Sequence, residues 1–98
     1  MFYRMTRIHF AEDRFEEFVE SAASLRDRVE RIAGLRFADL IRTGEGEGMI
    51  ISSYHDSLAF QASARAEAGV LDELAALLTS KPHGHEGSVV LSYQGISG

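Results

Sequence analysis

The spacing of apolar residues along this chain changes between that of a strand and that of a helix. The order of these changes is the feature that most restricts its fold. Runs rich in alternating, aromatic or β-branched residues, as in strands, occupy residues 2–10, 35–43, 49–54 and 89–93. Stretches with apolar residues at every third or fourth position, as on one face of a helix, occupy residues 13–32 and 57–78. The predicted order is therefore strand, helix, strand, strand, helix, strand.

This order predicts an α+β fold of the ferredoxin-like β-α-β-β-α-β type, in which two helices cover one face of a four-stranded antiparallel sheet. The opposite face needs another cover, because the strands have no wholly polar side. Tyr3 and Met5 point to one side of the first strand, and Ile8 and Phe10 point to the other. A second copy related by a two-fold axis provides that cover most simply. We therefore expect a homodimer in which the two sheets pack together.

Local signals predict where the helices begin and end. Asp13 and Glu16 have the spacing of a capping box at the start of the first helix, and Gly34 supplies its C-terminal stop. Asp56 or Ser57 is suited to cap the second helix, which Gly69 is expected to kink or divide.

Two segments are predicted to be connections. The glycine-rich residues 44–48 are short enough for an antiparallel hairpin. A phosphate-binding loop would instead open a helix, whereas this segment leads into the strand that begins at Met49. Residues 79–87 contain Pro82 and two glycines and are expected to form a flexible loop able to act as a lid.

Composition limits the partners. The 98-residue chain has the length of one domain, residues 1–98. Its net charge of −5 and its single lysine, Lys81, leave no basic face for nucleic acid. No apolar run approaches the ~20 residues of a membrane span. Residues 1–5 lack the apolar core of a signal peptide, and the chain has no cysteine. We therefore expect a cytoplasmic protein with no nucleic-acid or membrane partner.

Two stretches carry a resemblance to a known family. Residues 34–42 and, after the hairpin, residues 50–60 with the sequence IISSYHDSLAF resemble the middle of the antibiotic biosynthesis monooxygenase-like family. In that family the third strand usually ends in an aromatic residue, and a capped helix follows. The similarity extends as a pattern over nearly the whole chain. It implies the fold of the superfamily to which the family belongs, the dimeric α+β barrel.

The resemblance also implies a pocket between the sheet and the helices. Some relatives oxidise quinols or polycyclic aromatic compounds there with molecular oxygen and no cofactor, and others bind and open haem. Known versions rely on asparagine, tryptophan and histidine, but this sequence has no asparagine and no tryptophan. Helix positions that often hold histidine in the family fall on Ser63 and Ala68, which disfavours haem degradation because an axial ligand is missing.

Three residues are candidates for catalysis. Arg7 and His9 share one face of the first strand, where His9 can act as a base and Arg7 can hold an enolate or phenolate. The alternative is that this end of the strand is exposed to solvent. Asp39 can be a half-buried carboxylate that acts as a base, or it can pair with an arginine across the dimer.

Tyr54, Phe60 and Tyr93 are candidates for binding an aromatic or otherwise hydrophobic substrate. The alternative for these aromatic residues is packing in the core or at the dimer interface. His83, His85 and Glu86 have the side chains of a metal site, but a loop with little to hold it does not fix the three or four ligands that zinc requires. Neither a metal nor another cofactor is therefore expected.

Three functions stay open on this evidence. The first is a cofactor-independent monooxygenase that acts on an electron-rich aromatic or polyketide-like small molecule, and the family resemblance favours it. The second is a module that binds a hydrophobic small molecule without turning it over. The third is an oligomerising domain whose pocket is filled by phenylalanine side chains. Oxygen uptake separates the first function from the second, and ligand binding separates the second from the third.

Overall fold

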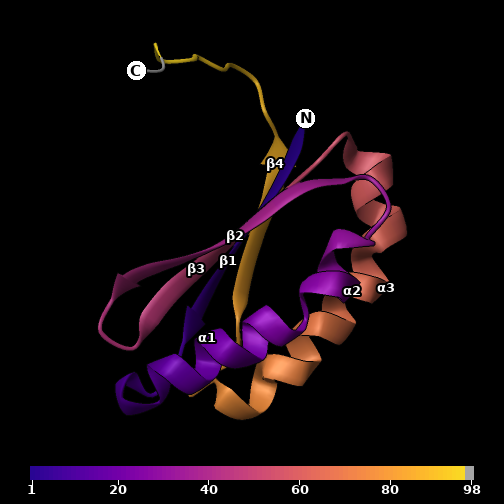
Figure 1. The fold of residues 1–98 in the computed structure, drawn as a ribbon. Helices are drawn as coiled ribbons and strands as arrows, with labels where there is room; N and C mark the ends of the chain where they lie inside the picture. The colour runs from indigo at the N-terminus through magenta and orange to yellow at the C-terminus, as the bar shows by residue number, and fades with distance from the viewer. Residues whose placement is uncertain (97–98) are drawn as a thin grey trace.

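The computed structural model of the chain describes residues 1–96. Its elements in chain order are β1 Phe2–His9, the 3₁₀ turn η1 Glu12–Arg14, α1 Phe15–Ser24, α2 Arg26–Glu30, β2 Leu35–Gly44, β3 Glu47–Tyr54, α3 Ser57–Leu74, the 3₁₀ turn η2 Ala75–Leu77 and β4 His83–Ser88. The four strands of this part of the chain form one antiparallel sheet in the order β2-β3-β1-β4. The helices gather on one face of the sheet (Figure 1). The predicted ferredoxin-like α+β fold is confirmed, with the first predicted helix divided into α1 and α2.

The hydrophobic core lies between the sheet and α1, near the end of β1. Its buried side chains are Ile8, Phe10, Phe18, Leu25 and Leu74. The Phe10 ring stacks on Phe18 with their centroids 5.3 Å apart. Burying one side chain of this size contributes about 1.5–3 kcal/mol to folding. The cluster therefore fixes α1 and the C-terminal end of α3 against the central strand.

The predicted capping box of Asp13 and Glu16 does not form at the start of the first helix. The turn η1 precedes α1, and no side chain caps either element. Glu12 instead makes a tertiary contact: its carboxylate accepts a hydrogen bond from the Gly46 amide at 2.8 Å and pairs with Arg42. Glu12 thus ties the segment before α1 to the β2–β3 turn. That turn is the predicted hairpin, with Gly46 in the left-handed region at φ 65°.

The predicted cap of α3 is present, but the predicted break is not. The Asp56 carboxylate accepts a hydrogen bond from the Ala59 amide at 2.8 Å, as an N-cap residue does. α3 then continues through Gly69 without interruption, so the expected division of the helix was wrong. A Cβ at Gly69 would make an ordinary contact with the Arg28 guanidinium at 3.5 Å. Within residues 1–96, no helix is both long and apolar enough to cross a membrane.

The last strand lies earlier than predicted. β4 occupies part of the segment 79–87, which was expected to be a loop and a lid, and the predicted strand at 89–93 is absent. After β4, the Val89 amide donates one more hydrogen bond to the Met1 carbonyl at 2.8 Å. Residues 89–96, which we call the C-terminal arm, then lead away from the sheet (Figure 1).

Pairing with β1 explains why β4 forms in a segment of low strand propensity. Glu86 of β4 forms an ion pair with Arg4 of β1 at 3.4 Å. Gly84 leaves the space that the Arg4 guanidinium occupies, because a Cβ at Gly84 would lie 2.8 Å from Arg4 Nη2. Contacts with the neighbouring strand β1 thus outweigh the low strand propensity of this segment, as is common in sheets.

Gly34 lies just before β2 and packs against the start of α3. Its backbone has φ 82°, and a Cβ there would lie 2.6 Å from the Ala59 Cβ. Its carbonyl accepts a hydrogen bond from the His55 amide at 3.2 Å. A glycine is therefore required where the chain passes α3.

Replacing Gly34 with alanine is expected to destabilise the fold by about 2 kcal/mol or more, because both backbone strain and the contact with Ala59 oppose a Cβ. Gly87→Ala is the matched control, since a Cβ at Gly87 would meet nothing within 4 Å. Chemical denaturation followed by circular dichroism measures both variants. Equal stability of the two would contradict this account of Gly34.

Candidate functional site

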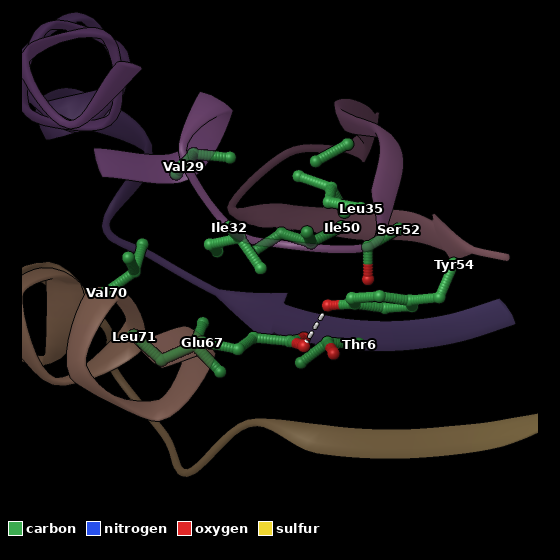
Figure 2. Close-up of a pocket in the computed structure, with 11 residues that line it drawn as sticks. Thr6, Val29, Ile32, Leu35, Ile50, Ser52, Tyr54, Glu67, Val70 and Leu71 are labelled. Carbon is green, nitrogen blue, oxygen red and sulfur yellow. Dashed lines mark hydrogen bonds between the residues drawn. The ribbon is translucent and has the colours of Figure 1, made fainter. Parts of the chain in front are cut away.

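A small cavity lies between the helix-facing side of the sheet and helices α2 and α3 (Figure 2). It encloses about 60 Å³. Its lining residues are Thr6, Val29, Ile32, Leu35, Ala38, Ile50, Ser52, Tyr54, Glu67, Val70 and Leu71. Most of these side chains are aliphatic, and the hydroxyl and carboxylate groups gather where β1 and β3 meet α3 (Figure 2). The cavity is therefore apolar with one polar end.

The cavity adjoins a larger cleft between α1, α2 and β2. The cleft encloses about 640 Å³, within the roughly 300–1,000 Å³ typical of small-molecule sites. The cavity and the cleft share five lining residues: Val29, Leu35, Ala38, Ile50 and Val70. The cavity and the cleft therefore lie side by side along these five residues.

Tyr54 and Glu67 form the centre of the polar end. Tyr54 is the last residue of β3 and is only 1% exposed. Its hydroxyl donates a hydrogen bond to Glu67 Oε2 on α3 (Figure 2). Burial raises the pKa of Tyr54 to about 12, and the hydrogen bond to Glu67 adds to the rise. Tyr54 therefore stays protonated near neutral pH and acts as a hydrogen-bond donor.

Arg4 places a positive charge beside the Glu67 carboxylate. Arg4 Nε lies 3.4 Å from Glu67 Oε1, and the side chains of Arg4 and Glu67 are 28% and 15% exposed. The guanidinium also lies over the Phe60 ring, 5.9 Å from its centroid. Burying a carboxylate is costly unless it is paired and hydrogen-bonded. Glu67 is thus held with one oxygen toward Arg4 and the other toward Tyr54.

Ser52 adds a second hydroxyl to the same end, close enough to Tyr54 to lower the pKa of its phenol against the larger effect of burial. It is 4% exposed, and its Oγ forms no hydrogen bond of normal geometry with any residue that the structure describes. Figure 2 shows this hydroxyl pointing toward the Tyr54 side of the cavity. Buried hydroxyls are normally hydrogen-bonded, so an unpartnered one is available to a ligand.

The aromatic residues predicted to bind substrate lie in different places. Tyr54 lines the cavity. Phe60 supports it from α3, because its ring packs edge-on against Tyr54 with the centroids 5.2 Å apart. Tyr93 lies in the C-terminal arm and is 86% exposed. The structure thus brings two of the three together.

The residues predicted to be catalytic do not line the cavity. Arg7 and His9 lie on the side of the sheet away from the helices, which we call the open face. His9 Nδ1 lies 3.2 Å from the Ser80 hydroxyl. Asp39 is exposed at the rim of the larger cleft. Catalytic roles for these three stay predictions, and those of Arg7 and His9 require a ligand on the open face.

Sequence reasoning missed Glu67, although a signal for it exists. Phe60, Ser63, Glu67, Val70 and Leu74 follow the three- and four-residue spacing of one helix face. A single carboxylate in that apolar row points inward. Recognising it required knowing that this face, and not another, packs on the sheet.

The histidine pair does not form a metal site within one chain. His83 and His85 lie on one side of β4, and Glu86 lies on the other because side chains alternate along a strand. Among residues 1–96, no three histidine, aspartate or glutamate side chains come together as metal ligands do.

Comparison with known proteins identifies the family. The sequence model described as antibiotic biosynthesis monooxygenase matches residues 1–70. The chain belongs to the antibiotic biosynthesis monooxygenase family. The resemblance found in the sequence is thereby confirmed. No curated protein sequence matches the chain.

Solved structures share the fold of this family member. A dimeric ferredoxin-like protein from an uncultured marine organism is 18% identical, with a TM-score of 0.80 over 97% of this chain and 92% of that chain. A candidate antibiotic biosynthesis monooxygenase from Caulobacter crescentus is 15% identical, with a TM-score of 0.76 over 92% and 90%. A variant of MhuD with two manganese protoporphyrin IX molecules bound per active site is 22% identical, with a TM-score of 0.75 over 97% and 100%.

The side chains of the cleft do not fit a haem group. The chain has 4 histidines, and none of them lines the cavity or the cleft. Ser63, on the inward face of α3, donates its hydroxyl to the Phe60 carbonyl at 2.9 Å. No imidazole is therefore placed to ligate iron within the cleft of one chain.

The raised pKa of Tyr54 predicts a specific pH dependence. Its folded-state pKa of about 12 lies above the ordinary value of 10, so stability from the protonated phenol is lost as pH rises from 10 through about 12. Wild type should therefore lose stability faster than Tyr54→Phe across this window. Tyr93→Phe is the control, because Tyr93 is exposed. Denaturation at several pH values and tyrosinate absorbance measure the effect, and identical curves for wild type and Tyr54→Phe would contradict it.

Proposed function

We propose that this protein is a cofactor-independent monooxygenase that oxidises an electron-rich aromatic or polyketide-like small molecule. The observation that supports it is the Glu67 carboxylate, held by Tyr54 and Arg4 at the polar end of an apolar cavity that adjoins a larger cleft. Membership of the antibiotic biosynthesis monooxygenase family agrees with this activity.

The lining of the cavity favours a neutral, largely apolar part of the substrate. The walls of the cavity are aliphatic, with Ile32, Leu35 and Leu71 among them. The charge that faces the cavity most directly is the negative one of Glu67, which opposes phosphate or carboxylate ligands. A phenol, quinol or anthrone presents one polar edge and an apolar body, which matches a cavity with one polar end.

The proposed reaction begins with proton transfer to Glu67. The carboxylate takes a proton from an acidic C–H group of the substrate, such as the CH₂ between the rings of an anthrone. The resulting enolate gives one electron to O₂, and the two radicals combine to form a C–O bond and a hydroperoxide. Loss of water then leaves a carbonyl. One oxygen atom of O₂ enters the product and the other leaves in water with the two hydrogens of the CH₂ group, so no external reductant is needed.

The neighbouring hydroxyls assist this step. Tyr54, which stays protonated, donates to Glu67 and keeps its carboxylate aimed into the cavity. The unpartnered Ser52 hydroxyl is available to donate to the enolate oxygen. The apolar walls exclude water, which protects the carbanion from reprotonation by solvent.

A second candidate is a protein that binds the same class of molecule without oxidising it. The observation that favours it is the composition of the site, because the chain lacks the asparagine and tryptophan on which the family's known oxygenases rely. Its test is the same experiment, with saturable binding but no oxygen uptake as the outcome.

Glu67→Gln is expected to lower the rate of oxygen uptake by about 100-fold or more, because the amide cannot accept the substrate proton. Glu73→Gln is the matched control: it lies on the same helix but pairs with Arg28 outside the cleft, and its side chain is 55% exposed. The assay follows oxygen consumption with an anthrone or quinol in protein free of metal and flavin, and ¹⁸O₂ labels the product. Equal rates for the two variants would exclude Glu67 as the base.

We also propose that the protein is a homodimer built on the open face. Apolar side chains there remain accessible: Met5, Phe37 and Ile41 are 38%, 36% and 41% exposed. The Tyr3 and Phe37 rings meet edge to face across this side of the sheet, with centroids 5.9 Å apart. Exposed apolar side chains gathered on one face of a sheet in this way are typical of an interface. A solved neighbour with a TM-score of 0.80 is described as dimeric.

Met5→Asp is expected to raise the dissociation constant of the dimer at least about tenfold, because it buries a charge at the interface. Leu58→Asp is the control, since Leu58 is 72% exposed on α3, away from the open face. Analytical ultracentrifugation over a range of concentrations measures dissociation. A monomeric wild type at micromolar concentration would overturn the dimer.

The composition supports two further predictions, one about partners and one about the cellular compartment. The net charge of −5 disfavours nucleic acid as a partner. The absence of cysteine suits a reducing compartment such as the cytoplasm.

A further inference from the structure

Arg4 is the only arginine within residues 1–96 that is not exposed to solvent. Its side chain is 28% exposed. In the sheet it lies between Ser52 of β3 and Glu86 of β4. Directly opposed residues of an antiparallel pair point to the same face, so all three side chains lie on the helix-facing side. Arg4 therefore stands between the polar end of the cavity, where Ser52 lies, and the outer edge of the sheet.

Each nitrogen of the Arg4 guanidinium has its own neighbour. Nε donates a hydrogen bond to the Thr6 hydroxyl at 3.3 Å and lies 3.4 Å from Glu67 Oε1. Nη1 lies 3.4 Å from Glu86 Oε2. Nη2 lies against Gly84, where a Cβ would come within 2.8 Å of it. Neighbours on β1, α3 and β4 thus fix both the position and the orientation of the planar group.

Gly84 is explained by this guanidinium and not by its own backbone. It lies inside β4, and its φ is not in the left-handed region that requires glycine. A glycine inside a strand weakens the strand and often marks a close approach by another group. Here that group is Arg4, because a Cβ at Gly84 would also lie 3.1 Å from Arg4 Cζ and 3.3 Å from Nε.

We propose that Arg4 is a positioning residue for Glu67, and that Gly84 and Glu86 of β4 hold Arg4 in place for this task. The inference rests on the function proposed above, in which Glu67 takes the substrate proton. Arg4 holds one oxygen of the Glu67 carboxylate, which leaves the other toward Tyr54. A displacement of a reacting group by about 1 Å can lower a rate about 100-fold, so the position of Arg4 affects the reaction.

β4 thereby belongs to the site although none of its residues lines the cavity or the cleft. Its ion pair with Arg4 contributes little to stability, because the Glu86 side chain is 47% exposed. Its position beside the guanidinium is what matters for the reaction. A change at this outer edge of the sheet is therefore expected to reach the base through a single side chain.

Gly84→Ala tests the inference without removing a charge. The atoms that the new Cβ would meet are the end of a flexible side chain, so the guanidinium can move aside while β4 stays paired with β1. Gly87→Ala is the matched control on the same strand, because a Cβ there would meet nothing within 4 Å. Arg4→Lys keeps the positive charge but loses the planar fork that faces three neighbours.

Two measurements are made on each variant. Crystal structures locate the Arg4 side chain and the Glu67 carboxylate, and oxygen uptake with an anthrone gives kcat and KM separately. We expect Gly84→Ala and Arg4→Lys to displace the Glu67 carboxylate. We expect both to lower kcat at least about tenfold and to change KM less than about twofold, because the aim of the base matters in the transition state. Gly87→Ala should match wild type in both measurements.

The outcomes separate this inference from the proposed function. A Glu67 carboxylate that keeps its place after the guanidinium has moved overturns the positioning role, whether or not oxygen is consumed. If β4 shifts in Gly84→Ala instead, Arg4→Lys decides by the same two measurements. A displaced carboxylate with an unchanged kcat overturns Glu67 as the base. A wild type that consumes no oxygen overturns the proposed function, and the crystal structures still decide whether β4 positions Glu67.

Discussion

β1 is hydrogen-bonded to a strand on each side. Its even-numbered and odd-numbered residues point to opposite faces of the sheet, one covered by the helices and one open. Thr6 and Ile8 face the helices and are buried, whereas Met5 and Arg7 face away and are exposed. Side chains alternate strictly along a strand, so a shift of one residue would exchange the two sets and expose the core. The core, the cleft and the open face all depend on this one register.

The polar end of the cavity is costly to bury within such a framework. Arg4 and Glu67 lose much of their contact with water, and Ser52 has no partner among the described residues. Removing a charged pair from water is rarely more favourable than packing apolar side chains of similar size. Breaking the pair by removing one partner is nevertheless costly, because the other charge is then left buried without a partner.

The fold was predictable because its signals are local, and the errors arose where distant contacts decide. The Asp56 cap involves residues three apart, whereas Arg4 and Glu86, which help to place β4, are 82 apart. The site was predictable only in part for the same reason. Tyr54 was found because it ends a strand, but its partner Glu67 becomes visible only once α3 is docked on the sheet.

The sequence by itself determined the order of the elements and the two-sided apolar character of β1, because hydrophobic periodicity acts over a few residues. It also determined the family, whose pattern extends over residues 1–70. The tertiary structure alone decided which side of the sheet holds the cavity and that Arg4, Tyr54 and Glu67 meet at its polar end. It also decided that the last strand is His83–Ser88, with the arm left uncovered. These features depend on the register between strands and on the packing of α3, and neither is encoded in any short stretch of the chain.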